Sequence, residues 1–150
     1  MKNIQNEADY KAITARIEKV APDAKALWGK MNAAQMICHA TDVLREATGV
    51  RKTKEKGNFF SHTILKWFSF YILTKWPKEK FPTSPSYDSL KDGTPPTDFK
   101  NDKDVLLKML SNMRSMTALS PHPFFGKLSV REWGRITYLH LDHHLRQFGC

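Results

Sequence analysis

Apolar residues recur at helical spacing along most of this chain, and no segment shows the strict apolar-polar alternation of a half-buried strand. The segments that follow this pattern also begin or end at typical helix signals, such as a capping polar residue or a glycine. The pattern predicts an all-α fold, namely a four-helix bundle with one further, connecting helix. The predicted helices are Glu7–Val20, Asn32–Gly49, 59–76, Asp102–Thr117 and Ser129–Phe148.

Two of these helices have capping-box starts, in which a side chain at the first position and one three residues later cap each other's backbone amides. Asn32 with Gln35 fits this pattern, as does Ser129 with Glu132. The segment 77–101 between helices three and four instead holds five of the eight prolines. It is predicted to be a long, irregular connection.

Composition sets the class of protein. The chain has 150 residues, of which 41% are hydrophobic. Residues 1–150 are therefore predicted to form a single domain with one core. The two cysteines are too few for a disulfide framework, and the first residues are polar where a secretory signal would be apolar. We therefore expect a reduced, soluble protein of the cytoplasm.

The net charge of +9 raises the alternative of a nucleic-acid-binding or anionic-membrane-binding protein. The lysines are spread along the whole chain, and no predicted helix interleaves basic and aromatic residues on one face. This distribution favours a solubilising surface, and it disfavours nucleic acid as a partner.

The segment 59–76, "FFSHTILKWFSFYILTKW", is the most membrane-like part of the sequence. It contains His62 and Lys66 and is at the lower length limit for crossing a bilayer, so a buried helix is favoured over a transmembrane one. Its many aromatic residues leave a lipid-facing or partner-facing surface as the alternative.

Three histidines fall within five positions of the last predicted helix, in "TYLHLDHHLRQFG". At about 100° per residue, His140 and His144 lie about 40° apart in the middle of the apolar side. His143 lies on the flank. Two inward imidazoles one turn apart can share a metal ion, as in H-E-x-x-H sites, or can be satisfied by hydrogen bonds to backbone or carboxylate groups.

A metal site would need a third ligand from another helix. His39 is at the edge of the apolar stripe of the second helix, where ligands in helical bundles project inward. His62 and His122 are the other candidates, each with an ordinary structural role as the alternative. Asp42, one turn after His39, is a candidate for orienting a ligand or transferring a proton, as is His143.

With these residues in place, the sequence resembles the DinB/YfiT-like superfamily of metalloenzymes. The stretches that fit are "WGKMNAAQM", "QMICHATD", "HPFFG", "EWG" and "HLDHHLRQF", which together span most of the chain. The resemblance implies a four-helix bundle with one divalent metal, nickel or zinc, on three histidines that match His39, His140 and His144. A glutamine follows this pair, here Gln147, but "HLRQ" replaces the commoner H-R-G-Q, so the pocket beside it is expected to differ.

The resemblance also implies a chemistry. A divalent ion on three neutral histidines keeps its charge and open positions, so it can activate water or a low-molecular-weight thiol. We therefore expect a metal-dependent hydrolase or thiol transferase that acts on a small molecule, with a homodimer as a possible assembly. The residue 77–101 connection and "PHPFFG" can close the mouth of the site. A non-catalytic metal-binding or sensing bundle is the main alternative, and a basic nucleic-acid or membrane-surface protein is the further one.

Overall fold

The computed structural model describes residues 1–54, 57–78, 87–88 and 91–150. Every regular element in this part of the chain is helical, which confirms the predicted all-α class. A single pair of bridging residues, His122 and Gly126, is the sole extended pairing among these residues. The elements are α1 (Glu7–Lys19), α2 (Ala33–Ala47), η1 (Ser61–Leu65), η2 (Phe68–Ile72), α3 (Phe99–Ser115) and α4 (Val130–Gln147).

Side-chain caps fix where the helices begin. Both predicted capping boxes are present, from Asn32 and Gln35 at α2 and from Ser129 and Glu132 at α4. α3 begins three residues before the predicted Asp102, because the side chain of Asp98 accepts a hydrogen bond from the backbone amide of Asn101.

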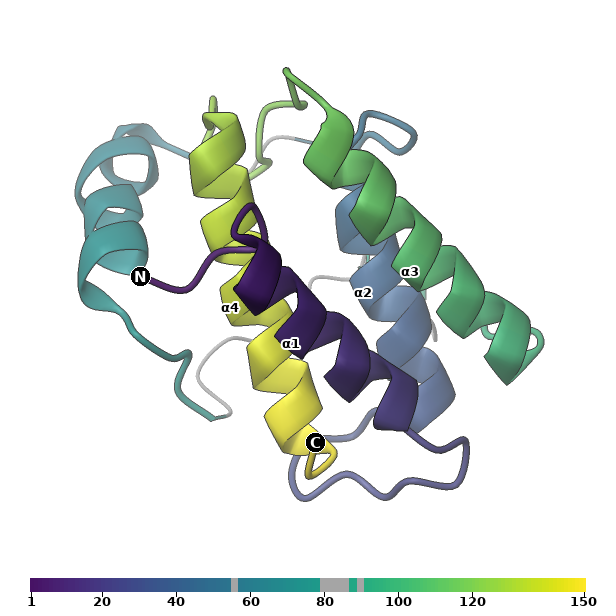
Figure 1. Cartoon of the computed structure of the whole chain (residues 1–150). Helices are drawn as coiled ribbons and strands as arrows, with labels where there is room; N and C mark the ends of the chain where they lie inside the picture. The colour runs from purple at the N-terminus through teal and green to yellow at the C-terminus, as the bar shows by residue number, and fades with distance from the viewer. Residues whose placement is uncertain (55–56, 79–86, 89–90) are drawn as a thin grey trace.

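The four α-helices lie side by side, as Figure 1 shows. α2 packs mainly on α3, α1 packs on α4, and the pairs meet where α1 contacts α3 and α2 contacts α4. Each helix turns its apolar stripe toward the others, as expected for amphipathic helices. The largest fully buried side chains at the centre are Ile13, Ile17, Met36, Ile37, Leu44, Leu106, Leu110, Met113, Trp133, Leu139 and Leu145.

The aromatic segment forms a helix over 59–72 that lies outside α4, on the side away from α3 (Figure 1). Its two π-helical parts, η1 and η2, contact each other, and η2 also contacts α4. The expectation of a buried helix is wrong for most of this segment, in which Ser61 and Phe70 alone are buried. The physical reason is that the α-helices already cover one another's apolar stripes, which leaves only an outer position.

Polar contacts of Ser61 and Lys66 attach the aromatic helix to the rest of the molecule. The hydroxyl of Ser61 donates to the carbonyl of Phe124 at 2.8 Å, and the ammonium of Lys66 donates to the carbonyl of Lys127 at 3.0 Å. Lys66 also pairs with Glu132 in the first turn of α4 at 3.0 Å. No helix among the described residues combines the length and apolar character needed to cross a bilayer.

The predicted irregular connection 77–101 falls partly outside the described residues, which leave out 79–86 and 89–90. The described portion before α3 contains no α-helix and no strand. It runs past α2, where the backbone and hydroxyl of Thr94 both donate to the carboxylate of Asp42, at 2.8 and 2.7 Å. This part of the connection is therefore attached to the helix that carries His39.

Candidate metal centre

The structure brings His39 of α2 together with His140 and His144 of α4. The Nε2 atom of His140 lies 2.8 Å from Nε2 of His39 and 3.2 Å from Nε2 of His144. All three residues are buried. These are the three ligands predicted from helical spacing and from the resemblance, and together they form a group that can hold a metal ion.

The spacing of the three nitrogens fits a metal site. Metal-to-nitrogen bonds of 2.0 to 2.1 Å place two ligand nitrogens about 2.8 to 3.4 Å apart, for ligand angles between 90° and tetrahedral. The measured separations of 2.8 and 3.2 Å are close to this range. All three ligand atoms lie within 4.8 Å of one another, so they are close enough together to bind one divalent ion.

Hydrogen bonds at the opposite ring nitrogens orient two of the imidazoles. Nδ1 of His39 lies 3.0 Å from the backbone carbonyl of Tyr87, and Nδ1 of His144 lies 2.9 Å from the side-chain oxygen of Gln147. Both partners accept hydrogen bonds, so each Nδ1 carries the proton and each Nε2 presents a lone pair. Ligand histidines in metal sites are commonly oriented in this way.

The lone pairs cannot all be satisfied within the cluster. A neutral imidazole has one N–H, so His140 can donate from Nε2 to either His39 or His144 but not well to both. At least one buried lone pair is then left facing another nitrogen, an arrangement that costs free energy unless a cation occupies the space. This shortage of protons is the observation that most favours a metal here.

Burial keeps the three histidines neutral. Loss of hydration lowers the pKa of His39 and lowers the pKa values of His140 and His144 well below the ordinary histidine range. For His140 and His144, the neighbouring imidazoles lower the pKa further, because two adjacent imidazolium ions repel. Neutral imidazole is the form that binds a metal.

Gln147 links the site to the loop before α2. Its side-chain oxygen accepts a hydrogen bond from His144, and its side-chain nitrogen donates one to the backbone carbonyl of Trp28 at 2.6 Å. The backbone carbonyl of Gln147 also accepts a hydrogen bond from the backbone amide of Leu27 at 2.7 Å. Gly29 has φ +77°, and a Cβ there would lie 2.6 Å from the Gln147 nitrogen. The glycine of "WGK" is thus required both by its conformation and by this close approach.

His143 lies beside the three-histidine cluster but is not part of it. Its ring is next to those of Trp28 and Trp76, with centroids 6.1 and 6.3 Å away, and it lines the same cavity as the cluster. Its Nδ1 is buried without a hydrogen-bond partner, and burial lowers its pKa. The ring of His143 is thus part of the cavity wall, and its predicted catalytic role stays a prediction.

Asp42 points to a different set of partners. Its carboxylate is fully buried and accepts from Arg45 at 2.9 Å, from Arg51 at 2.5 Å and twice from Thr94. These donors, Thr94 first among them, hold the pKa of Asp42 below its usual value despite burial. None of these bonds goes to His39, so the contacts describe an anchor for the connection, and a catalytic role for Asp42 stays a prediction.

The remaining histidine candidates lie outside the cluster. His62 is exposed on the aromatic helix, and its ring lies against the backbone at Gly57 and Gly126. His122 is in the "PHPFFG" turn, where its Nδ1 accepts from the amides of Phe124 and Phe125 at 3.0 and 3.2 Å. Burial lowers the pKa of His122 to about 4, so the turn is organised around a neutral imidazole.

A cavity of about 540 Å³ lies next to the three histidines. It is bounded by α2, α4, the aromatic helix and the "PHPFFG" turn, and its walls are mostly apolar and aromatic, as is usual for sites that bind small organic molecules. The turn is thus at the cavity, where it was expected to close the site. The apolar lining residues are Val43, Leu65, Phe68, Leu73, Trp76, Pro123, Phe124, Phe125, Trp133 and Ile136.

Several polar residues at this cavity were not predicted, among them Glu46 and Tyr87. Glu46 is buried and accepts from the hydroxyl of Tyr87 at 3.4 Å and from the amide of Thr53 at 3.2 Å. It follows His39 by seven residues and so occupies the same face of α2 two turns later. That spacing was a usable signal, whereas nothing in the sequence around Tyr87 indicated that its carbonyl would orient His39.

Comparison with curated proteins and with solved structures gave no match. A family model does match, and it covers residues 3–149, nearly the whole chain. The matched region includes all three clustered histidines and Gln147. The chain therefore belongs to the family described as "Protein of unknown function (DUF1569)".

Proposed function

We propose that this protein is a metal-dependent enzyme of the DinB/YfiT-like type, with a four-helix bundle that holds one divalent ion, nickel or zinc, on His39, His140 and His144. The observation that carries the proposal is the convergence of three buried Nε2 atoms with too few protons to satisfy one another. The closed ring of contacts among α1, α4, α2 and α3 supports the bundle assignment.

An open position at the ion distinguishes a catalytic site from a structural one. Among the described residues, the group that can hold a metal comprises the three histidines alone, with no fourth histidine, cysteine or carboxylate. Their other side faces the cavity. A bound divalent ion would act there as a Lewis acid that lowers the pKa of a water or thiol.

The cavity suggests the kind of substrate. Its apolar and aromatic walls would hold a small molecule with an apolar body, and the polar groups beside the histidines would orient the reacting end. His143, whose ring lines the cavity and is kept neutral by burial, would accept a proton from the substrate, and Glu46 would orient a polar group of the ligand or of Tyr87. The reaction that we propose is hydrolysis or transfer of a low-molecular-weight thiol.

Metal analysis tests the ligand assignment. Purified wild-type protein, dialysed against nickel or zinc and then against buffer, should keep one ion per chain. His39→Ala, His140→Ala and His144→Ala should each retain far less, whereas the matched control His62→Ala should retain as much as wild type. Circular dichroism of every variant separates loss of metal from loss of fold. Equal stoichiometry in folded His140→Ala and wild type would overturn the assignment.

A spectroscopic titration tests the open position. Cobalt-loaded protein should change its visible absorption when a small thiol is added, since the ligand field of cobalt reports on what binds next to the histidines. An unchanged spectrum at saturating thiol would remove thiol transfer from the proposal and leave hydrolysis.

A further inference from the structure

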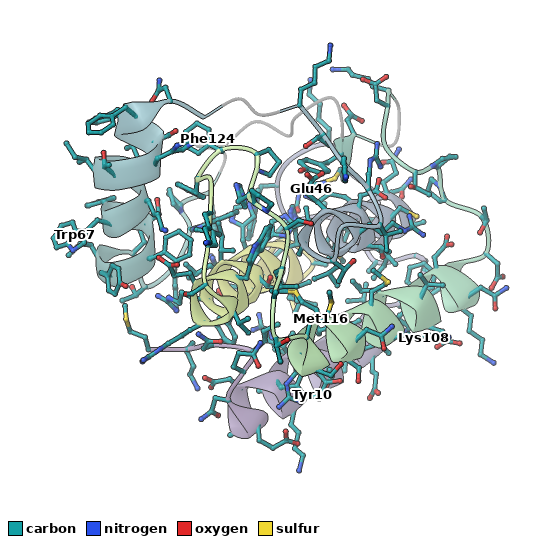
Figure 2. The ribbon with its side chains drawn as sticks, turned by 90° about the horizontal axis from the view of Figure 1, so that it is seen from above. Tyr10, Glu46, Trp67, Lys108, Met116 and Phe124 are labelled. Atoms are coloured by element: carbon teal, nitrogen blue, oxygen red, sulfur yellow. The ribbon has the colours of Figure 1, made fainter. Side chains whose placement is uncertain are left out.

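The aromatic helix carries an exposed apolar stripe. Its residues follow one another at intervals of three or four along most of the helix, so they share one side of it. Figure 2 shows Trp67 on this side, pointing away from the rest of the molecule. We call the stripe the aromatic face, and it consists of Phe59, Phe60, Ile64, Trp67, Phe68, Tyr71 and Ile72.

The exposure of this face is unusual for side chains of this size. Phe59 is 83% exposed, and Ile64 and Trp67 are 59% and 57% exposed. Large apolar side chains that are gathered on one surface mark a site of interaction, whereas isolated ones do not. The four α-helices do not cover the face, which is therefore accessible to another molecule.

The charge of the surrounding sequence indicates the kind of partner. Residues 51–80 include eight lysines and arginines and only two glutamates, although Arg51 and Lys66 are paired with Asp42 and Glu132 outside this segment. Two lysines near the helix are exposed. Lys75 comes just after the helix, and Lys127 is in the loop before α4, where its backbone carbonyl accepts a hydrogen bond from Lys66. An anionic surface complements this segment, and a second copy of the chain would repel it.

We propose that the aromatic face binds the surface of an anionic lipid bilayer. A helix that lies in the interface buries its apolar side among the acyl chains and places lysines at the headgroups, and tryptophan and tyrosine are the side chains favoured at that depth. The face has this composition, with Trp67 and Tyr71 beside phenylalanine and isoleucine. Positive charge nearby adds attraction to anionic lipids. The proposal does not depend on the metal.

The cavity opens beside the same face. Phe68 and Phe124 both line the cavity, yet they are 45% and 41% exposed, so they form part of its rim. A bilayer on the aromatic face would therefore lie against the rim. An apolar molecule could then pass between the membrane and the cavity without entering bulk water.

Vesicle sedimentation tests the proposal. Wild-type protein should bind vesicles of phosphatidylcholine with phosphatidylglycerol, should bind pure phosphatidylcholine at least about tenfold more weakly, and should dissociate as salt is raised. The double variant Ile64→Ser with Trp67→Ser should lose at least about tenfold in affinity for the anionic vesicles. Val105→Ser, which removes an exposed β-branched residue from α3, should bind like wild type.

A charge pair of variants tests the electrostatic part. The double variant Lys75→Glu with Lys127→Glu should weaken vesicle binding severalfold more than a control double variant does. The control, Lys100→Glu with Lys108→Glu, changes the net charge by the same amount but on α3. Figure 2 shows Lys108 on the far side of the molecule from Trp67. Equal losses in the two double variants would overturn the proposal that this face makes the contact.

Two further outcomes would overturn the proposal altogether. One is wild-type protein that does not bind anionic vesicles at low salt. The other combines two results: light scattering shows a dimer for wild type and a monomer for the Ile64→Ser, Trp67→Ser variant, and neither protein binds vesicles. A second copy of the chain would then cover the face. Circular dichroism of each variant checks that the helices remain folded.

Discussion

α2 carries two buried polar clusters about one turn apart, and they differ in how completely they are satisfied. Each carboxylate oxygen of Asp42 accepts two hydrogen bonds, from Thr94 and from Arg45 or Arg51. At His39, in contrast, three imidazole nitrogens face one another with too few protons between them. The first cluster is complete with protein groups alone, whereas the second is a group of three histidines that could hold a metal ion.

The largest expected effect is on the complete cluster. Asp42→Ala leaves two guanidinium groups and Thr94 without their buried acceptor, so we expect the free energy of unfolding to fall by about 3 kcal/mol. Urea unfolding followed by circular dichroism measures the change, with Asp104→Ala on the exposed side of α3 as the control. In the metal-free protein, His39→Ala should lower the free energy of unfolding by less than Asp42→Ala does. An equal or larger decrease would contradict the proposed difference between the two clusters.

Metal should stabilise the incomplete cluster. Nickel or zinc at 100 times its dissociation constant should raise the free energy of unfolding by about 2.7 kcal/mol, because the ion binds the folded chain only. The same titration of His140→Ala should give almost no increase. The Asp42→Ala variant should show the same metal-induced rise in the free energy of unfolding as wild type. A smaller rise in this variant would mean that the two clusters are coupled.

Near neutral pH, the free energy of unfolding should depend on pH through the histidines rather than through Asp42. A histidine whose pKa is lowered on folding binds more protons when unfolded, so its stabilising effect is complete above pH 6.5 and falls as the pH drops toward the folded value. For His122, with a pKa of about 4, the loss at pH 5 is about 2 kcal/mol. His122→Asn keeps an acceptor for the turn amides without titrating. Its unfolding free energy should therefore vary less between pH 7 and pH 5 than that of the metal-free wild type, and an unchanged slope would contradict the prediction.

The smallest expected effect concerns the orientation of one ligand. Gln147→Leu removes the acceptor at Nδ1 of His144, and loss of such a partner typically lowers metal affinity about tenfold. Competition with a chelating dye measures the affinity, and His62→Ala serves as a control that should match wild type. Stoichiometry should stay at one ion, because the three ligands are still present. Unchanged affinity in Gln147→Leu would show that packing alone orients His144.

Sequence reasoning succeeded where the determinants are local. The starts of α2 and α4 follow from Asn32 and Ser129, whose caps depend on residues three positions away. His140 and His144 could be assigned to one face because a helix of known pitch fixes their directions. The partnership with His39 needed the further idea that apolar stripes of different helices meet, and helical spacing alone left hydrogen-bonded histidines as an equal alternative.

It failed where distant segments decide the outcome. The aromatic segment has the apolar content of a buried helix, yet its place outside α4 depends on how the other helices already fill the core. The roles of Arg51 and Thr94 at Asp42, and of the Tyr87 carbonyl at His39, depend on the path of loops. Loop paths follow from tertiary contacts rather than from residue periodicity, so no pattern in the sequence predicts them.

The contact between Gln147 and the loop before α2 has a consequence for how this chain can vary in length. Loops on protein surfaces usually tolerate added or lost residues. Here the backbone at Leu27, Trp28 and Gly29 is held against Gln147, which in turn holds His144. Extra residues should therefore be accepted at the exposed positions 21–23, where none of these bonds is made. One residue inserted at 27–29 would change the register of the loop and misdirect an imidazole more than a hundred positions further along the chain.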